Sequence, residues 1–112
     1  DIKLTINSIR EQESGVLLDP EPGNTYKILN ITIENTGAME IPISTMLAFY
    51  ILDNSNNRYC VSLTCGTEGN IGKTLSPRST MEGEIAFEVN ENAEDLKLIF
   101  EPGIFGQASI NL

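Results

Sequence analysis

Apolar and polar residues alternate along several short stretches of the chain, which is the pattern of a β-strand that packs one face against a core. Residues 81–89 show it most clearly, because apolar residues and Gly83 there alternate with Glu82, Glu84 and Glu88. Residues 26–34 are rich in β-branched side chains and predict a central strand. Further strands are predicted over residues 2–9, 47–52, 59–63, 96–100 and 107–112.

Turn-forming residues end the first strands. Residues 19–24 contain two prolines and a glycine, which predicts a chain reversal before the central strand. Asn35-Thr36-Gly37 ends that strand, since Asn and Gly both tolerate the left-handed conformation of a tight connection. Residues 41–43 are expected at a sheet edge or a bend, because Pro42 has no N–H to donate to a central ladder.

The middle of the chain predicts a hairpin followed by a long loop. Residues 47–52 are continuously apolar, a pattern that fits a buried strand but also a helix. The polar residues 53–57 interrupt the apolar pattern before it resumes, which predicts a hairpin over 47–63. Residues 64–79 are rich in Gly, Ser, Thr and Pro, so we expect a long loop with a short strand near 73–75.

Seven or eight short strands separated by turns are typical of a β-sandwich, and no stretch shows the 3.6-residue period of a helix. We therefore predict a single all-β domain over residues 1–112, with no helix longer than one turn. Its architecture is a Greek-key sandwich of two antiparallel sheets, and a closed antiparallel barrel is the alternative. The predicted core residues are Ile31, Ile33, Phe49, Ile51, Ile85 and Phe87.

The charge of the chain excludes some partners. Its 112 residues include 16 Asp and Glu against 7 Lys and Arg, a net charge of −9. Such an acidic protein repels nucleic acid and anionic membranes, and no apolar run approaches the roughly 20 residues of a membrane span. The chain begins at Asp1 without a signal peptide, so we expect a processed or trimmed chain whose export signal or lipid anchor would lie upstream.

Cys60 and Cys65 are the two cysteines of the chain. In an extended strand they would lie about 17 Å apart, and a disulfide tolerates a Cα separation of only about 7 Å, so a bridge requires a chain reversal within residues 61–64. The alternatives are two buried unpaired thiols, or a metal or redox role, although a zinc site here would lack half of its usual ligands. We predict the Cys60–Cys65 disulfide, in keeping with an exported protein.

Asp53, Ser55 and Asn57 place oxygen-bearing side chains at alternate positions, as a calcium loop does. Arg58 and Thr64 stand where such a loop has its Gly and Glu, so a plain hairpin loop is favoured over a calcium site. The acidic residues of the other turns, which could reinforce an ion site, are expected to be solvated. We therefore predict no metal and no other cofactor.

Catalytic chemistry is not indicated by the sequence. It contains no histidine and no Ser-x-x-Lys arrangement, so a nucleophile would lack its usual base. A carboxylate pair for glycoside hydrolysis stays open, but the domain is small for a substrate cleft. We predict no enzymatic activity and no catalytic residue. Near the end of the chain, Phe105 is expected to plug the end of the sandwich, with an exposed contact tip as the alternative.

Four segments resemble, in order, a family of secreted bacterial and archaeal domains with no assigned function. Residues 26–37 look like its strand followed by Asn-Thr-Gly, and residues 49–53 with Tyr59 look like its aromatic hairpin. Two later segments are similar to its closing strands: Leu75-Ser76-Pro77 with Gly83 and Phe87, and Leu96-Lys97-Leu98. The family's members are often lipoproteins and are similar to the mycobacterial immunoprotective extracellular antigen.

The resemblance implies an immunoglobulin-like fold and an extracellular or cell-surface location, and it lends no catalytic residues to this chain. The chain departs from the family at Arg78, where a Gly usually follows Pro77. Without that Gly a type II turn is disfavoured, and we predict a type I turn.

These observations favour two functions and leave a third as less favoured. The first is a non-catalytic extracellular or cell-surface module that binds a protein or an envelope component through loops or a sheet edge. The second is a structural spacer domain of a lipid-anchored surface protein, and an ion-binding or enzymatic domain comes third. The sequence leaves the identity of the partner and the oligomeric state open.

Overall fold

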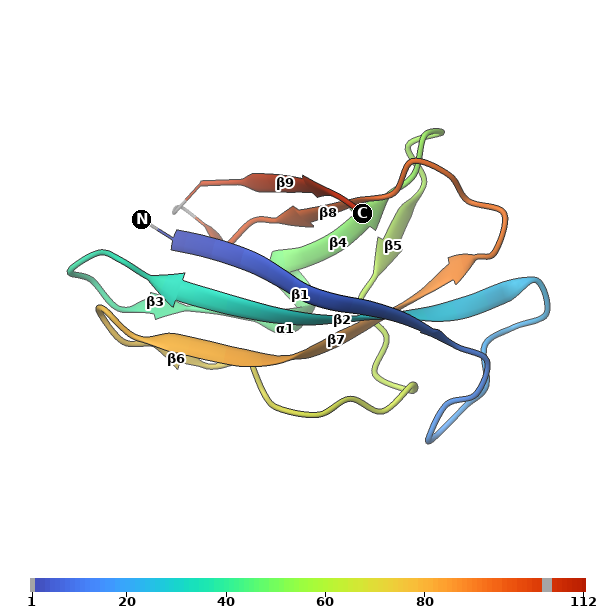
Figure 1. The fold of residues 1–112 in the computed structure, drawn as a ribbon, viewed down its shortest axis with the longest axis horizontal. Coiled ribbons are helices and arrows are strands. Elements are labelled where there is room, and N and C mark those ends of the chain that lie inside the picture. The colour runs from blue at the N-terminus through green and yellow to red at the C-terminus, as the bar shows by residue number, and fades with distance from the viewer. Residues whose placement is uncertain (1, 104–105) are drawn as a thin grey trace.

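The computed structural model describes residues 2–103 and 106–112 and is built mainly of strands (Figure 1). About 50% of the chain is strand and 5% is helix, which confirms the all-β prediction. The described residues form nine strands and a one-turn helix: β1 (Ile2–Gln12), β2 (Asn24–Asn35), β3 (Ile41–Pro42), α1 (Thr45–Ala48), β4 (Phe49–Leu52), β5 (Arg58–Cys60), β6 (Thr74–Leu75), β7 (Thr80–Asn90), β8 (Lys97–Phe100) and β9 (Ala108–Asn111).

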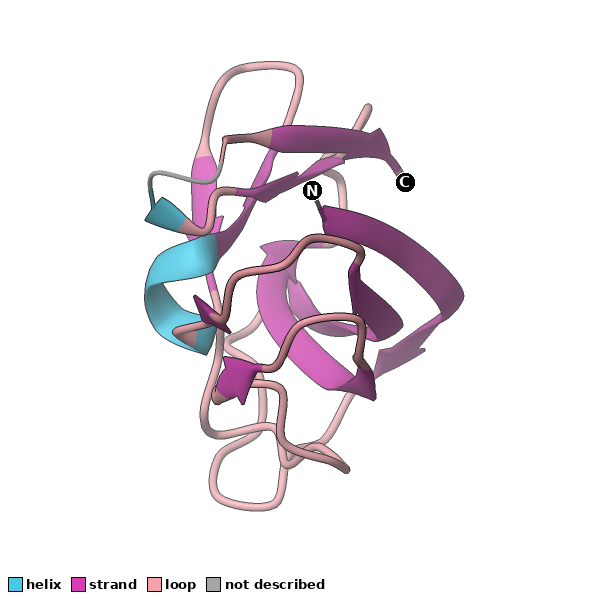
Figure 2. Cartoon of the chain, turned by 90° about the vertical axis from the view of Figure 1, so that its left-hand side faces the viewer, coloured by secondary structure: helices cyan, strands magenta, loops and turns pink. Residues whose placement is uncertain are grey.

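The strands lie in two facing layers (Figures 1 and 2). One layer is the sheet β1-β2-β7, the other is the sheet β5-β4-β8-β9, and β3 and β6 form a small separate pair. Every pairing is antiparallel. The chain crosses between the layers from β2 to β4, from β5 to β7 and from β7 to β8, as in the immunoglobulin sandwich. The predicted Greek-key sandwich is therefore confirmed, and the alternative of one closed sheet is not observed.

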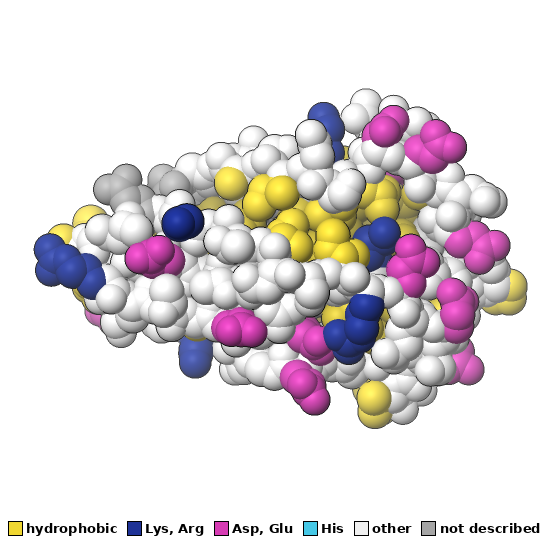
Figure 3. All heavy atoms as spheres, in the orientation of Figure 1, with side chains coloured by type: hydrophobic (Ala, Val, Ile, Leu, Met, Phe, Trp, Pro, Cys, Tyr) yellow, Lys and Arg dark blue, Asp and Glu magenta, His cyan; other side chains and the backbone are white. Residues whose placement is uncertain are grey.

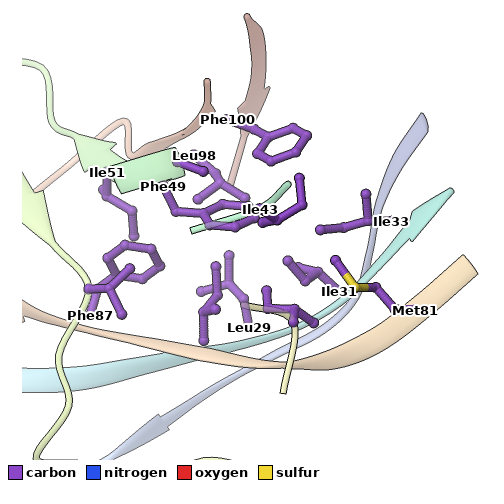
Figure 4. Packing of buried hydrophobic residues seen from close by; sticks show 14 of the residues in the cluster. Leu29, Ile31, Ile33, Ile43, Phe49, Ile51, Met81, Phe87, Leu98 and Phe100 are labelled. Atoms are coloured by element: carbon purple, nitrogen blue, oxygen red, sulfur yellow. The ribbon is translucent and has the colours of Figure 1, made fainter. Parts of the chain in front are cut away.

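The main core lies between the layers and includes the inner face of β2 (Figure 4). Leu29, Ile31 and Ile33 point from β2 into this core, where the rings of Phe49 and Phe100 stack with centroids 4.7 Å apart. All six core residues predicted from the sequence are confirmed, since each is at most 1% exposed.

The predicted strand over residues 47–52 begins two residues late, because residues 45–48 form α1. The N–H of Ala48 donates to the carbonyl of Ser44 at 2.8 Å, which closes a single helical turn. This turn buries Ala48 and leaves Leu47 79% exposed. The apolar run thus divides between the two structures that its pattern could not distinguish.

Other boundaries differ less. β1 continues to Gln12, three residues beyond its predicted end, and its pairing with β2 shifts register between Ile6 and Ser8. The short strand expected near residues 73–75 is present as β6, within an otherwise long loop. The role predicted for Phe105 concerns a position outside the described residues.

The outer face of β2 is buried as well. Tyr26 and Ile28 point away from the main core and pack with Ala86 of β7 and with Cys65, which follows β5 in the chain. All four residues are at most 1% exposed. Strand β2 is therefore central in two senses, since it has a strand on each side and a buried cluster on each face.

The turn between β6 and β7 differs from the sequence prediction. Arg78 has a φ of 55°, in the left-handed region, whereas both central residues of a type I turn have negative φ. The predicted type I turn is therefore wrong. Buried Asn35 at the end of β2 holds this turn, because its N–H donates to the carbonyl of Ser79 at 2.9 Å and its side-chain amide donates to the carbonyl of Ser76 at 3.2 Å.

Arg78→Gly is expected to stabilise the protein. The left-handed conformation costs an L-residue about 1–2 kcal/mol, which exceeds the roughly 0.5–1 kcal/mol of extra chain entropy that glycine loses on folding. We expect the free energy of unfolding in urea to rise by about 0.5–1 kcal/mol. Arg78→Ala is the matched control, since it removes the charge but keeps the Cβ. An equal gain in both variants would show that strain is not the cause.

Candidate functional site: an apolar loop tip

The loop between β1 and β2 presents three consecutive apolar side chains to solvent. Val16, Leu17 and Leu18 are 78%, 71% and 63% exposed. Single exposed leucines are ordinary, but a run of three is avoided in soluble proteins unless it has a function. These three residues, called the apolar tip below, sit on the loop between β1 and β2, which extends below the sheet in Figure 1.

Backbone hydrogen bonds fix the apolar tip to the segment that follows β5. The N–H of Val16 donates to the carbonyl of Cys65 at 2.9 Å, and the N–H of Leu17 donates to the carbonyl of Thr64 at 3.0 Å. The buried Tyr26 ties the two segments from below, since its hydroxyl donates to the carbonyl of Leu18 at 2.8 Å and lies 2.7 Å from the hydroxyl of Thr64. The tip is therefore a held structure with solvent-facing side chains.

Two glycines allow this close approach of backbone to backbone. A Cβ at Gly15 would come within 1.9 Å of the carbonyl oxygen of Leu18, so a side chain does not fit there. A Cβ at Gly66, which has a φ of 87°, would come within 2.3 Å of a methyl group of Val16. Val16 thus lies directly over Gly66, while Leu63, three residues earlier, is a further exposed apolar side chain at 68%.

The surroundings of the apolar tip are acidic. Residues 11–26 contain four acidic residues and no Lys or Arg. The flanking cations are engaged in ion pairs, Arg10 with Glu84 and Lys27 with Glu11, the latter at 3.6 Å. The hydrogen bond from Arg10 lowers the pKa of Glu84 and raises that of Arg10. Most acidic side chains visible in Figure 3 lie over its right-hand half, the end that carries this loop in Figure 1.

Sequence reasoning did not single out residues 16–18. The available signal was an apolar triplet between Gly15 and Asp19-Pro20, too short for a strand and without alternation. That signal does not distinguish a buried plug from an exposed tip, because the difference depends on where the segment after β5 lies.

The candidate calcium residues lie together in the β4–β5 loop. The carboxylate of Asp53 accepts hydrogen bonds from the backbone N–H groups of Ser55 and Asn57, both at 2.9 Å, and from the side-chain amide of Asn57 at 2.9 Å. The hydroxyl of Tyr59 donates a fourth bond at 3.0 Å. In this structure, Asp53 organises a hairpin loop. Among the described residues, no group of three or more His, Cys, Asp or Glu side chains is placed to hold a metal ion.

The predicted Cys60–Cys65 disulfide is not supported, since both thiols are free. Cys60 is exposed on β5, and its neighbour Tyr59 packs on the main core, so strand alternation turns Cys60 to the outside of that sheet. Cys65 is buried on the outer face of the other sheet. Between them Val61 bridges to Phe87 of β7, so the chain crosses from one layer to the other and separates the two thiols.

The sequence matches one described family over nearly its whole length. Residues 1–110 match a domain of unknown function, DUF4352. The chain belongs to the DUF4352 family. Among curated protein sequences, none matches this DUF4352 chain significantly.

Solved structures of low sequence identity share the fold of this DUF4352 domain. A Bacillus subtilis "putative lipoprotein (ycdA)" aligns with a TM-score of 0.83 and 13% identity, over 99% of this chain and 36% of that one. The yjhA protein of Bacillus subtilis aligns with a TM-score of 0.78 and 15% identity, over 99% of this chain and 91% of that one. The secreted protein MPT63 of Mycobacterium tuberculosis aligns with a TM-score of 0.61 and 14% identity, over 99% of this chain and 77% of that one.

These matches confirm the family resemblance and the sandwich fold inferred from the sequence. This chain spans about a third of the first of these structures, so the fold is what the two share. Among the described residues, no helix has the length and apolarity needed to cross a membrane.

The two cysteines should react differently with iodoacetamide. Cys60 is exposed, whereas burial raises the pKa of the Cys65 thiol and shields it, so little thiolate is available at Cys65 near neutral pH. We expect mass spectrometry of the native protein without reductant to show one modified thiol, and two after denaturation. Cys60→Ser should abolish native labelling, and Cys65→Ser should leave it unchanged. Native protein that resists alkylation until reduced would contradict the free thiols.

Asp53 should make the protein sensitive to acid. Its hydrogen bonds, above all that from the Asn57 side chain, lower its pKa in the folded state. The resulting stabilisation is complete above the unfolded pKa of about 3.9 and is lost as the pH falls through the lower folded value. In urea unfolding between about pH 6 and pH 2, Asp53→Asn should therefore lose less stability than the wild type.

Tyr59→Phe provides a graded control for Asp53. It removes one of the four hydrogen bonds to the carboxylate and keeps the aromatic ring, so its acid sensitivity should lie between those of the wild type and Asp53→Asn. Identical pH profiles in all three proteins would show that this carboxylate does not stabilise the loop.

Proposed function

We propose that this DUF4352 domain is a non-catalytic binding module, located outside the cell or on its surface, that contacts a protein or envelope component through the apolar tip. The observation that carries the proposal is the exposure of Val16, Leu17 and Leu18 on a loop held by backbone hydrogen bonds. An apolar side chain gains about 1.5–3 kcal/mol when it is fully buried, so a partner that covered all three would gain several kcal/mol before the costs of association.

The fixed backbone of the loop lowers the free-energy cost of binding. Binding usually costs free energy for ordering mobile loops, and a loop already fixed in place avoids most of that cost. Here the hydrogen bonds of Val16, Leu17 and Leu18 to their neighbours order the loop backbone before any partner arrives. A few well-packed and fully desolvated anchor residues supply most of the binding energy in protein interfaces.

The location is supported by two proteins of the same fold. One is the "putative lipoprotein (ycdA)" of Bacillus subtilis, and the other is the secreted protein MPT63. The alternative function, a spacer domain of a lipid-anchored surface protein, fits the same two proteins. A spacer would have no use for an exposed apolar triplet, so the apolar tip favours the binding module.

Binding to whole cells tests this function. Fluorescently labelled domain is titrated onto cells of the source organism and onto their isolated envelopes, and bound label is measured by cytometry and sedimentation. We expect Leu17→Asp to reduce binding at least tenfold, since it places a charge in the contact. Leu47→Asp is the matched control, because Leu47 is at least as exposed as Leu17 but lies in α1.

The two variants separate the possible outcomes. Retained binding of Leu47→Asp with loss for Leu17→Asp supports the proposal, provided that circular dichroism shows both variants folded. Equal binding of the two variants, or no binding of the wild type to either preparation, would overturn it.

A further inference from the structure

The acidic residues around the apolar tip come from both segments that form it. Glu13, Asp19 and Glu21 belong to the tip loop, and Glu68 is the one charged residue within residues 59–72 of the facing segment. All four residues are exposed. None of them forms an ion pair within the part of the chain that the structure describes. The two segments that form the tip therefore carry four exposed carboxylates, and none of these is in an ion pair within the described residues.

The nearby cations are engaged mainly with other carboxylates, and only Glu68 interacts electrostatically with one of them, Arg10. Arg10 and Lys27 flank the segment, and each is already paired with a different carboxylate, Glu84 or Glu11. Glu88 adds another negative charge below the loop, where its carboxylate accepts the backbone N–H of Glu21 at 3.0 Å and the side-chain amide of Asn24 at 2.8 Å. Both of these donors are uncharged, so the negative charge of Glu88 adds to that of the loop.

We infer that the partner of the apolar tip is a cationic amphipathic polypeptide segment, with an apolar face bordered by Lys or Arg side chains. This inference rests on the proposed function, since it takes the tip as the contact surface. Apolar side chains of the partner cover Val16, Leu17 and Leu18, and its basic border faces Glu13, Asp19, Glu21 and Glu68. Such complementarity speeds encounter and rejects acidic partners.

The same charges disfavour a lipid surface. An exposed apolar triplet alone would suit insertion into the headgroup region of a bilayer. Bacterial and other natural membranes that carry anionic lipids attract basic segments, however, and four unpaired carboxylates next to the insertion point oppose their approach. The charge of the loop therefore favours a polypeptide over a membrane.

Synthetic peptides test the inference directly. The probe is an 18-residue peptide of Lys and Leu whose sequence segregates the leucines on one helical face. A peptide of identical composition with the leucines dispersed and an amphipathic Glu and Leu peptide are the controls. Calorimetry with the wild-type domain should show binding of the segregated Lys and Leu peptide at least tenfold tighter than of either control.

Variants of the domain assign the binding to the tip. Leu17→Ser should weaken binding about tenfold, and the double variant Glu13→Gln with Glu21→Gln should weaken it about fivefold and reduce its salt dependence. The double variant Glu40→Gln with Glu82→Gln has the same net charge but changes exposed carboxylates outside the tip, so its affinity should change less than twofold. Equal effects of the two double variants would mean that net charge alone drives binding, and would overturn the inference.

Lipid vesicles test whether the apolar tip binds a membrane instead of a polypeptide. Sedimentation with vesicles of phosphatidylcholine alone, and with one third phosphatidylglycerol, should show no Leu17-dependent binding. Binding to vesicles that is lost in Leu17→Asp would overturn the polypeptide partner in favour of lipid. If the peptide does not bind while cell binding still depends on Leu17, the partner chemistry is wrong and the proposed function stands. If cell binding does not depend on Leu17, the proposed function itself fails.

Discussion

The burial of β2 on both faces is the constraint on which the rest of the structure depends. Its inner face supplies Leu29, Ile31 and Ile33 to the core between the layers. Its outer face carries Tyr26 and Ile28, which must be covered by another part of the chain. A sandwich sheet usually leaves its outer face to solvent, with polar residues there. Because Tyr26 and Ile28 are apolar over most of their surface, the domain needs a third layer of loop at this place.

That covering loop is also what creates the candidate functional site. Cys65 packs onto the outer cluster and brings its own carbonyl and that of Thr64 to the position where Val16 and Leu17 bind them. Tyr26 anchors the arrangement, since its ring is buried in the cluster while its hydroxyl bonds to Leu18 and Thr64. The apolar tip thus rests on the cluster that completes the fold, so tip and outer face share one set of contacts.

The structure separates residues that are adjacent in sequence and joins residues that are distant. Cys60 and Cys65 lie five positions apart but end on opposite outer faces, because Val61 carries the chain across to β7. Val16 and Cys65 lie 49 positions apart (65 − 16) and share a backbone hydrogen bond. The predicted disulfide, which is not supported, and the apolar tip, in a loop to which the sequence assigned no role, are the two corresponding differences between sequence and structure.

The sequence by itself determined the strands, the sandwich and the six predicted core residues. The reason is that apolar and polar residues alternate within each strand, and this local pattern shows which side chains are buried. It also indicated the family through short motifs in order. Only the tertiary structure decided the helical turn at residues 45–48, the left-handed Arg78, the separate thiols and the apolar tip. Each is accompanied by a contact distant in sequence, such as the bonds from Asn35 to Ser79, from Glu101 to Ala48 and from Val16 to Cys65. A pattern within one segment cannot show such a partner.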